Sequence, residues 1–167
     1  MKAFRIALAR YGRTAREAFS GMSGYCTDGR WHAAGRHLDY AAEHLSLAIL
    51  ERLVHYKRVD DLQAHVLCTL DLPEAVIHAP TSAEIPPGWD GLDLLPAAQA
   101  VGNAWHDHAR SPALRVPSAV TPGEFNLLIN ARHAAWDWDW ASAPVPIRLD
   151  ARLEELVTSA KHRSFRR

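Results

Sequence analysis

The chain has 167 residues, of which 48% are hydrophobic and 23% are charged. This length and composition are typical of one globular domain and exclude a largely disordered chain. Nineteen Lys and Arg residues balance nineteen Asp and Glu residues, so no net charge attracts the protein to nucleic acid or to an anionic membrane.

Compartment and partners are predicted from the same simple features. Cys26 and Cys68 are too few for a disulfide scaffold, and the first residues do not resemble a signal peptide. No run approaches the ~18 to 20 apolar residues that cross a bilayer. We therefore predict a cytoplasmic protein with no membrane role and no direct binding to nucleic acid, because a short basic end such as this one is more often solvated than bound.

The N-terminal third is predicted to be a strand followed by a long loop. Residues 4–10 alternate apolar and basic side chains, as a half-buried strand does. Residues 12–35 contain five glycines and few apolar residues at either period. Loops of more than ~12 to 15 residues are uncommon and usually functional, and Arg30 and Trp31 argue against a solvated linker, so we expect a binding surface here. A short strand follows at residues 37–41.

A helix is predicted at residues 43–56. Glu51 and His55 lie four residues apart on its far side, flanked by Leu47 and Val54, so Glu51 should be only partly exposed. The apolar stripe expected to face the core consists of Leu45, Ile49, Leu53 and Tyr56.

The rest of the chain alternates strands with one further helix. We predict a loop at residues 81–95 and a helix at residues 96–110 that begins with proline. Alternating indoles at Trp136, Trp138 and Trp140 suggest one face of a strand, packed or covered by a partner rather than stacking bases. Strands are predicted at residues 64–72, 114–120 and 125–129, and residues 74–77 are expected to continue the sheet after a break at Pro73.

Strands that follow one another without crossover helices indicate an α+β domain rather than a doubly wound parallel sheet. We assign residues 1–150 to this domain and residues 151–167 to a C-terminal helix and basic tail.

Several short blocks occur in a fixed order along most of the chain. Together they resemble the RES domain family, which is named for its Arg, Glu and Ser and supplies the toxin of toxin–antitoxin pairs. The blocks are Phe4-Arg5-Ile6, Ser20-Gly21, Gly29-Arg30-Trp31 with Gly35 and Tyr40, residues 48–55 around Glu51, Leu95-Pro96, Gly102-Asn103-Ala104-Trp105, Val116-Pro117-Ser118-Ala119-Val120, and residues 126–130 with His133.

The resemblance implies a fold like that of the ADP-ribosylating toxins and cleavage of the bond between nicotinamide and ribose in NAD⁺, the substrate, without a metal. It implies Arg30, Tyr40, Glu51 and Ser118 as the catalytic set, and adds Gly29 and Trp31 to Arg30 and Tyr40 for cofactor binding. It also implies an Xre-type helix-turn-helix antitoxin as partner, with a homodimer inside that complex as one arrangement.

Two departures from the family pattern stand in the chain. His32 replaces the usual asparagine after Gly-Arg-Trp, and alanines at positions 131 and 134 replace the two prolines that usually surround His133. These changes affect loop geometry and turnover rather than the class of reaction.

The site residues have chemistry that fits this reaction, and each has a plainer alternative. Arg30 presents a permanently charged fork suited to the pyrophosphate, or pairs with Asp28 on the surface. Tyr40 stacks on nicotinamide with its hydroxyl at the pocket mouth, or belongs to the core. Glu51 stabilises the cationic ribose, or pairs with His55 on the helix surface.

Ser118 needs a hydrogen-bond partner, because it stands in an otherwise apolar strand. Glu51, the ligand or nearby backbone would each supply one. It is not assigned as a nucleophile, since no Gly-x-Ser-x-Gly elbow surrounds it.

Other functions are weighed against this one. Ten histidines suggest a metal, but His106 and His108 point in different directions on a helix and no His-Glu-x-x-His motif is present. The closer alternative is an ADP-ribosyltransferase with a protein target, and a third is a non-catalytic nucleotide-binding module. The sequence leaves open whether the reaction is hydrolysis or transfer and which molecule accepts the ADP-ribose. It also leaves open the toxin–antitoxin stoichiometry and the trigger that releases the toxin.

Overall fold

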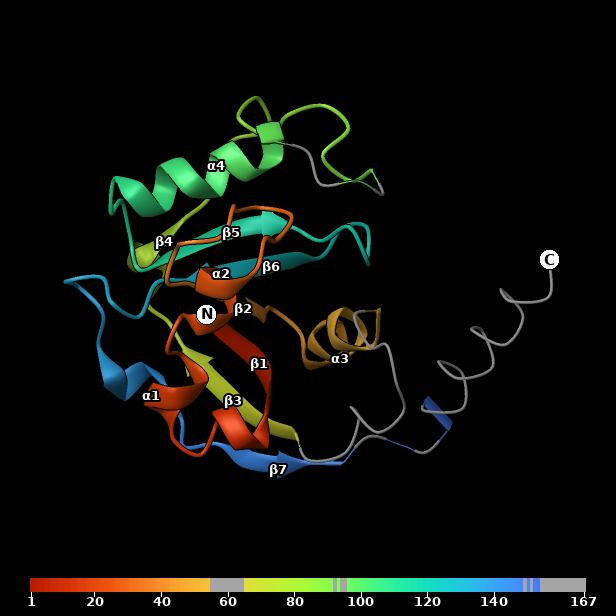
Figure 1. Cartoon of the computed structure of the whole chain (residues 1–167), viewed down its shortest axis with the longest axis vertical. Helices are drawn as coiled ribbons and strands as arrows, with labels where there is room; N and C mark the ends of the chain where they lie inside the picture. The colour runs from red at the N-terminus through yellow and green to blue at the C-terminus, as the bar shows by residue number, and fades with distance from the viewer. Residues whose placement is uncertain (55–64, 92, 94–95, 149, 151, 154–167) are drawn as a thin grey trace.

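The computed structural model describes residues 1–54, 65–91, 93, 96–148, 150 and 152–153. Its centre is a seven-stranded mixed sheet in the order β4-β5-β6-β2-β1-β3-β7, which Figure 1 shows from the β4 end to the β7 end. The pair β4 and β5 is parallel and the other neighbouring pairs are antiparallel. The strands are β1 (Lys2–Leu8), β2 (Asp39–Ala42), β3 (His65–Asp71), β4 (Ile77–His78), β5 (Ala113–Pro117), β6 (Phe125–Ile129) and β7 (Val145–Ile147).

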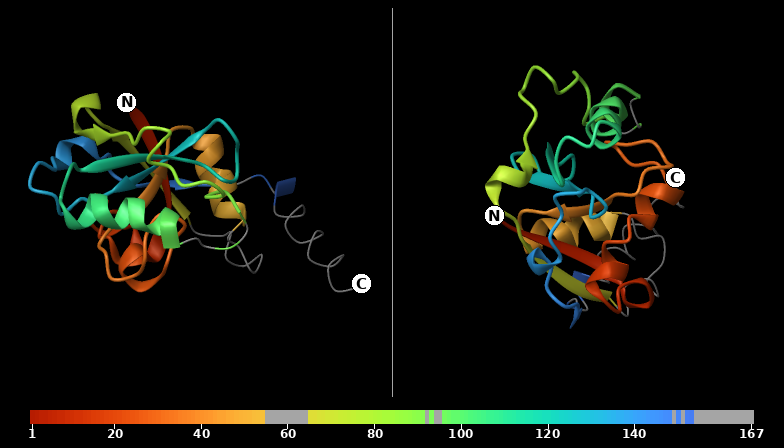
Figure 2. Two further views of the ribbon diagram at one scale, coloured as in Figure 1. Left: turned by 90° about the horizontal axis from the view of Figure 1, so that it is seen from above. Right: turned by 90° about the vertical axis from the view of Figure 1, so that its left-hand side faces the viewer.

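Two longer helices pack at different places along this sheet. Helix α3 (Leu45–Val54) lies against β1 and β2, whereas α4 (Pro96–Asp107) packs near the β5 end. The two helices lie apart in all three views (Figures 1 and 2). The short helices are α1 (Ala15–Ala18) and α2 (Met22–Cys26), and the 3-10 turns are η1 (Ala9–Tyr11), η3 (Glu74–Val76) and η4 (Trp138–Trp140).

Strand alternation divides the core into two sides. Tyr40 and Ala42 share one face of β2, because successive side chains of a strand point to opposite faces, and in β6 they lie opposite Leu128 and Asn126. Two apolar clusters cover this face, one under α4 and the loop around Trp31 and the other under α3. A third cluster covers the opposite face. The predicted α+β class is therefore confirmed.

The predicted helix at residues 43–56 is present, but its buried side differs from the expected stripe. Leu47 and Ala48 are the buried residues of α3, while Leu45 and Ile49 of the expected stripe are partly buried and pack against the same cluster. A pattern with a spacing of about four does not show which of two adjoining apolar faces packs inward. Glu51 lies one turn after the buried Leu47 and is therefore on the side of α3 that faces the sheet. Tyr56 and His55 lie outside the described residues.

Other expectations are corrected in detail. Residues 12–35 are not one continuous loop, since α1 and α2 lie within them. Of residues 74–77, which are expected to continue the sheet, the first three form the 3-10 turn η3. Ile77 does enter the sheet, in β4, which pairs with β5 at the far edge. The tryptophans near the end do not share a strand face: η4 holds two of them, and both rings pack edge-on against Trp136.

The ends of several predicted elements also move. The first strand stops at Leu8, the helix that begins at Pro96 stops at Asp107, and the strand after it stops at Pro117. Of the predicted C-terminal helix and tail, residues 151 and 154–167 lie outside the described residues. Among the residues that the structure describes, no helix is both long and apolar enough to cross a membrane.

Candidate functional site

Glu51 is held at the inner side of α3 by two uncharged donors. Its Oε1 accepts a hydrogen bond of 2.7 Å from the Ser118 hydroxyl and one of 2.5 Å from Nδ2 of Asn126. The described residues donate two hydrogen bonds to this carboxylate, and Oε1 accepts both. Among the described residues, the half-buried Glu51 is therefore held by dipoles rather than by a cation, so these contacts leave its charge available to a ligand.

Ser118 orients this carboxylate with a hydroxyl whose bonding capacity is fully used. Its Oγ donates to Glu51 and accepts from the backbone N–H groups of Val120, at 3.0 Å, and Thr121, at 3.2 Å. A serine hydroxyl has one hydrogen and two lone pairs, so its orientation is set. The bond to Glu51 that the sequence offers as one alternative is present, together with the bonds to nearby backbone.

Tyr40 points its hydroxyl into the loop that carries Arg30. The hydroxyl lies 2.8 Å from Nδ1 of His32 and 3.4 Å from the backbone N–H of Trp31. Burial raises the pKa of Tyr40; the Trp31 N–H and the charge of Arg30 oppose this rise, and the charge of Glu51 adds to it. The phenol is therefore protonated at neutral pH, and its pKa is affected by the charges of both Glu51 and Arg30.

Arg30 crosses from its loop to the segment after residue 87. Its Nη1 donates to the carbonyl oxygens of Trp89 and Gly91, each at 2.7 Å. The alternative pairing with Asp28 is not observed, because that carboxylate accepts from the N–H of Ala34 instead. Carbonyl oxygens leave the positive charge of a guanidinium uncancelled, so Arg30 remains suited to an anionic ligand.

Helix α4 supports the loop through one face of its surface. Gln99 Nε2 donates to the carbonyls of Gly29, at 3.1 Å, and His32, at 3.2 Å. Asn103 Oδ1 accepts from the backbone N–H of Ala33 at 3.0 Å. Between these two side chains, a Cβ on Gly102 would lie 1.9 Å from the carbonyl oxygen of Trp31. Only glycine allows so close an approach of helix and loop.

Position 29 also requires glycine, on the side of the loop that faces His32 and Tyr40. A Cβ there would meet the His32 ring at 2.6 Å and the Tyr40 hydroxyl oxygen at 2.7 Å. The side chain of Trp31 is 1% exposed and stacks on Trp89 at 5.2 Å between ring centroids. Trp31 thus supports the wall of the site with its ring and contributes its backbone N–H to Tyr40.

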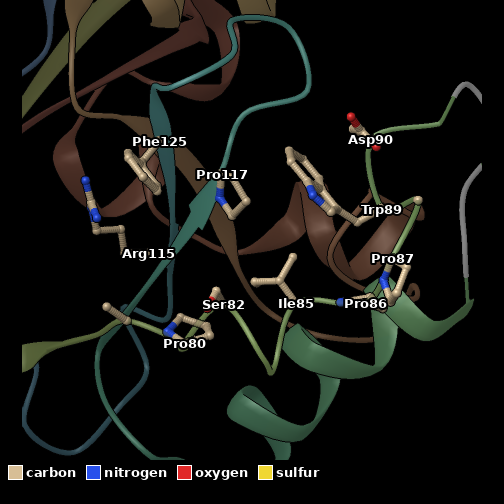
Figure 3. A pocket seen from close by; sticks show the side chains of 12 residues that line it. Pro80, Ser82, Ile85, Pro86, Pro87, Trp89, Asp90, Arg115, Pro117 and Phe125 are labelled. Atoms are coloured by element: carbon tan, nitrogen blue, oxygen red, sulfur yellow. The ribbon is translucent and has the colours of Figure 1, made fainter.

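A cavity of about 640 Å³ adjoins these residues beside the ends of β5 and β6. Trp89 and Pro117 line it, as do Arg115 and Phe125, which lie together on the other side of Pro117 in Figure 3. Arg115 is paired with Glu43. None of the four predicted catalytic residues lines the cavity, but Trp89 binds Arg30 and Pro117 directly precedes Ser118.

The structure joins Glu51 to Ser118 directly, and the charges of Glu51 and Arg30 each act on the pKa of Tyr40. Two residues were missed as members of the site. Asn126 stands in a family block, and its burial as a polar strand residue is the signal that could have singled it out. His32 stood out only as a departure from the family pattern. Among the described residues, no cluster of three or more metal-binding side chains is present.

Comparison with known proteins identifies the family. The family model of the RES domain matches residues 2–149. The chain belongs to the RES domain family. A relative named Toxin Res from Photorhabdus laumondii is 32% identical over 127 residues, which cover 76% of this chain and 80% of the relative. The Prs ADP-ribosylating toxin of a Sphingobium species is 33% identical over 117 residues, or 68% of this chain and 73% of the relative.

The fold is shared with a chain of a solved toxin–antitoxin complex. The chain resembles a chain in the crystal structure of the Mycobacterium tuberculosis MbcT-MbcA toxin–antitoxin complex, with a TM-score of 0.69 and 19% identity, covering 95% of this chain and 88% of the other. At this identity the likeness concerns the fold alone. The expected RES family and fold are thus confirmed.

Proposed function

We propose that this RES-family chain is a toxin that hydrolyses NAD⁺ at the bond between nicotinamide and ribose. The observation that carries the proposal is the half-buried Glu51 carboxylate, which two neutral donors hold by one oxygen and whose charge, like that of Arg30, acts on the hydroxyl of Tyr40. Such a carboxylate can stabilise a positive charge that develops on a sugar ring.

In the proposed reaction the bond between C1′ of the ribose and the pyridinium nitrogen breaks, and both bonding electrons leave with neutral nicotinamide. Glu51 stabilises the oxocarbenium-like ribose and orients a water molecule. Water adds to C1′ and releases one proton, which gives ADP-ribose. Arg30 contributes positive charge for the pyrophosphate, and the cavity beside Trp89 has the size of typical ligand pockets.

The direct test follows NAD⁺, nicotinamide and ADP-ribose with the purified chain and with Glu51→Gln. Glutamine keeps an oxygen for Ser118 and Asn126 but removes the charge, so we expect cleavage to fall about 10²- to 10³-fold with little change in thermal stability. Glu74→Gln, at an exposed position, is the control and should cleave like the parent. A parent that leaves NAD⁺ intact would overturn the proposal, and parental activity in Glu51→Gln would remove Glu51 from it.

A second candidate is transfer of ADP-ribose to a protein, which the name of the Sphingobium relative favours. The two reactions share the cleavage step and differ in the acceptor. Free ADP-ribose without labelled protein supports hydrolysis, and label on protein from NAD⁺ carrying a tagged adenine supports transfer.

We also propose that an Xre-type antitoxin covers the site in a cytoplasmic complex. A toxin–antitoxin complex with the same fold supports a protein partner of this kind. Copurification of a neighbouring small helix-turn-helix protein, with loss of NAD⁺ cleavage on its addition, would test this pairing. The mass of the complex would tell whether it contains a toxin homodimer.

A further inference from the structure

His32 is buried between the loop and Tyr40, with a 2% exposed surface. Its two ring nitrogens have different neighbours. Nε2 lies 3.1 Å from the carbonyl oxygen of Thr27, and Nδ1 lies 2.8 Å from the hydroxyl of Tyr40. The ring is thus linked at both ends, and these links connect the loop before Arg30 to β2.

The first link determines the tautomer. A carbonyl oxygen only accepts hydrogen bonds, so Nε2 must carry the ring hydrogen. In a neutral imidazole Nδ1 then has a lone pair and accepts, which requires the Tyr40 hydroxyl to donate to it. The hydroxyl also receives the Trp31 N–H at 3.4 Å. Its hydrogen is therefore engaged inside the protein and not available to a ligand.

We propose that His32 is a positioning residue: as the neutral, Nε2-protonated tautomer it takes the Tyr40 hydroxyl as donor and so holds the phenol ring in the site. The proposal deepens the proposed function, on which its kinetic consequence rests. Tyr40 then offers a ligand its ring and a hydroxyl lone pair, but no hydrogen-bond donor. This differs from a tyrosine whose free hydroxyl stands at the pocket mouth.

Protonation of His32 breaks this arrangement, because a charged imidazole donates from both nitrogens. Burial lowers the pKa of His32, and the Arg36 charge lowers it further, whereas the carbonyls of Thr27 and Gly24 and the charge of Asp28 raise it. From β2 the ring faces the Tyr40 hydroxyl. From α4 the uncharged Gln99 binds its backbone, and Asp107 is paired with Arg36. The neutral form is therefore favoured at neutral pH, and the hold on Tyr40 weakens in acid.

Nitrogen-15 NMR of the histidine rings in the full chain tests the tautomer without any assay of NAD⁺. The signals of His32 are those that vanish in His32→Asn. We expect a neutral ring at pH 7 with hydrogen on Nε2, and a changed Nδ1 shift in Tyr40→Phe, which lacks the donor. A neutral ring with hydrogen on Nδ1, a charged ring at pH 7, or an Nδ1 shift unaffected by Tyr40→Phe would overturn the proposal.

The kinetic test compares the pH profile of kcat/KM for NAD⁺ cleavage in the parent, His32→Asn and His32→Leu. The parent should lose activity below pH ~6.5, the ordinary histidine pKa, over the range where NMR shows His32 charging. Asparagine can still accept from Tyr40 through its amide oxygen, so His32→Asn should stay within about threefold of the parent at pH 8 and lack this acid limb. His32→Leu should be about tenfold slower at every pH.

The two arms separate the two proposals. An acid limb that is unchanged in folded His32→Asn would overturn the positioning role while NAD⁺ cleavage itself stands. An inactive parent would instead overturn the proposed function, and the NMR arm would still decide the tautomer. Thermal unfolding of each variant checks that the comparison is made between folded proteins.

Discussion

Glu51 shows how single hydrogen bonds can fix the orientation of a carboxylate. One of its oxygens accepts from both Ser118 and Asn126, and neither donor carries a charge. The amide of Asn126 is mostly buried in β6 and serves no other described partner. A substitution at this residue therefore changes the environment of Glu51 with little direct effect on the ligand.

Asn126→Asp is predicted to place a second carboxyl against Glu51. Two carboxyls this close cannot both be ionised easily, so the pair shares one proton near neutral pH. We expect NAD⁺ cleavage at pH 7 to fall about tenfold or more and to recover partly toward pH 9. Asn126→Leu, similar in size but neutral, should lower the rate without this recovery. Equal pH profiles for the two variants would contradict the coupling, and the rate of nicotinamide release measures both.

Sequence motifs name candidate site residues, but they do not predict the contacts between them. Arg30, Tyr40 and Glu51 stand in recognisable blocks, and the buried Ser118 hydroxyl predicts its own need for a partner. The bond between Tyr40 and His32 is not predictable in the same way. It depends on how a glycine-rich loop folds back on β2, and loop backbone has no periodic pattern that would show this.

Local periodicity explains which elements could be predicted. Residues 125–129 form a short, nearly continuous apolar run that packs on both faces of the sheet, and β6 has these bounds. By contrast, β4 has two residues, and its pairing with a distant strand leaves no local pattern. The alternating tryptophans do not form the predicted strand, because the Asp137 side chain accepts from the N–H of Asp139 and starts a 3-10 turn.

Helix α4 can pack closely against the loop that carries Arg30 because residue 102 is glycine. Gly102→Ala should push the helix from the carbonyl oxygen of Trp31, which a Cβ would approach to 1.9 Å. We expect a loss of about 1 to 3 kcal/mol in the free energy of unfolding, as for other overpacked sites, although alanine normally favours a helix by about 1 kcal/mol. Because the loop also holds Arg30, NAD⁺ cleavage should fall too.

Ala100→Gly is the matched control for this helix. Its side chain is exposed, so it should lose about 1 kcal/mol through helix propensity alone and keep the parental rate of cleavage. Urea unfolding and nicotinamide release would be measured on both variants. Stabilisation by Gly102→Ala would show that helix and loop are not packed as described.

At the scale of the whole molecule, one buried ion pair connects the sheet to the loop that precedes the site. Asp39 in β2 accepts from Arg5 of β1 at 2.6 Å, from the N–H of Gly21 at 2.7 Å and from the Ser23 hydroxyl at 3.1 Å. The same arginine donates to the carbonyl of Tyr40 at 2.8 Å. The network thus links β1, β2 and the N-terminal part of the loop across the face opposite to Glu51.

Breaking this pair should be the most destabilising change considered so far. Arg5 and Asp39 have side chains that are 14% and 2% exposed, so Asp39→Asn or Arg5→Met alone leaves a buried charge without its partner and should cost about 3 to 5 kcal/mol. The double variant removes both charges, so its loss should be smaller than the sum of the single losses by about 0.5 to 3 kcal/mol. Asp107→Asn breaks the more exposed pair with Arg36 and should cost at most about 1 kcal/mol. Urea unfolding of the parent and the four variants gives these values, and strictly additive losses would mean that the two charges do not stabilise each other across β1 and β2.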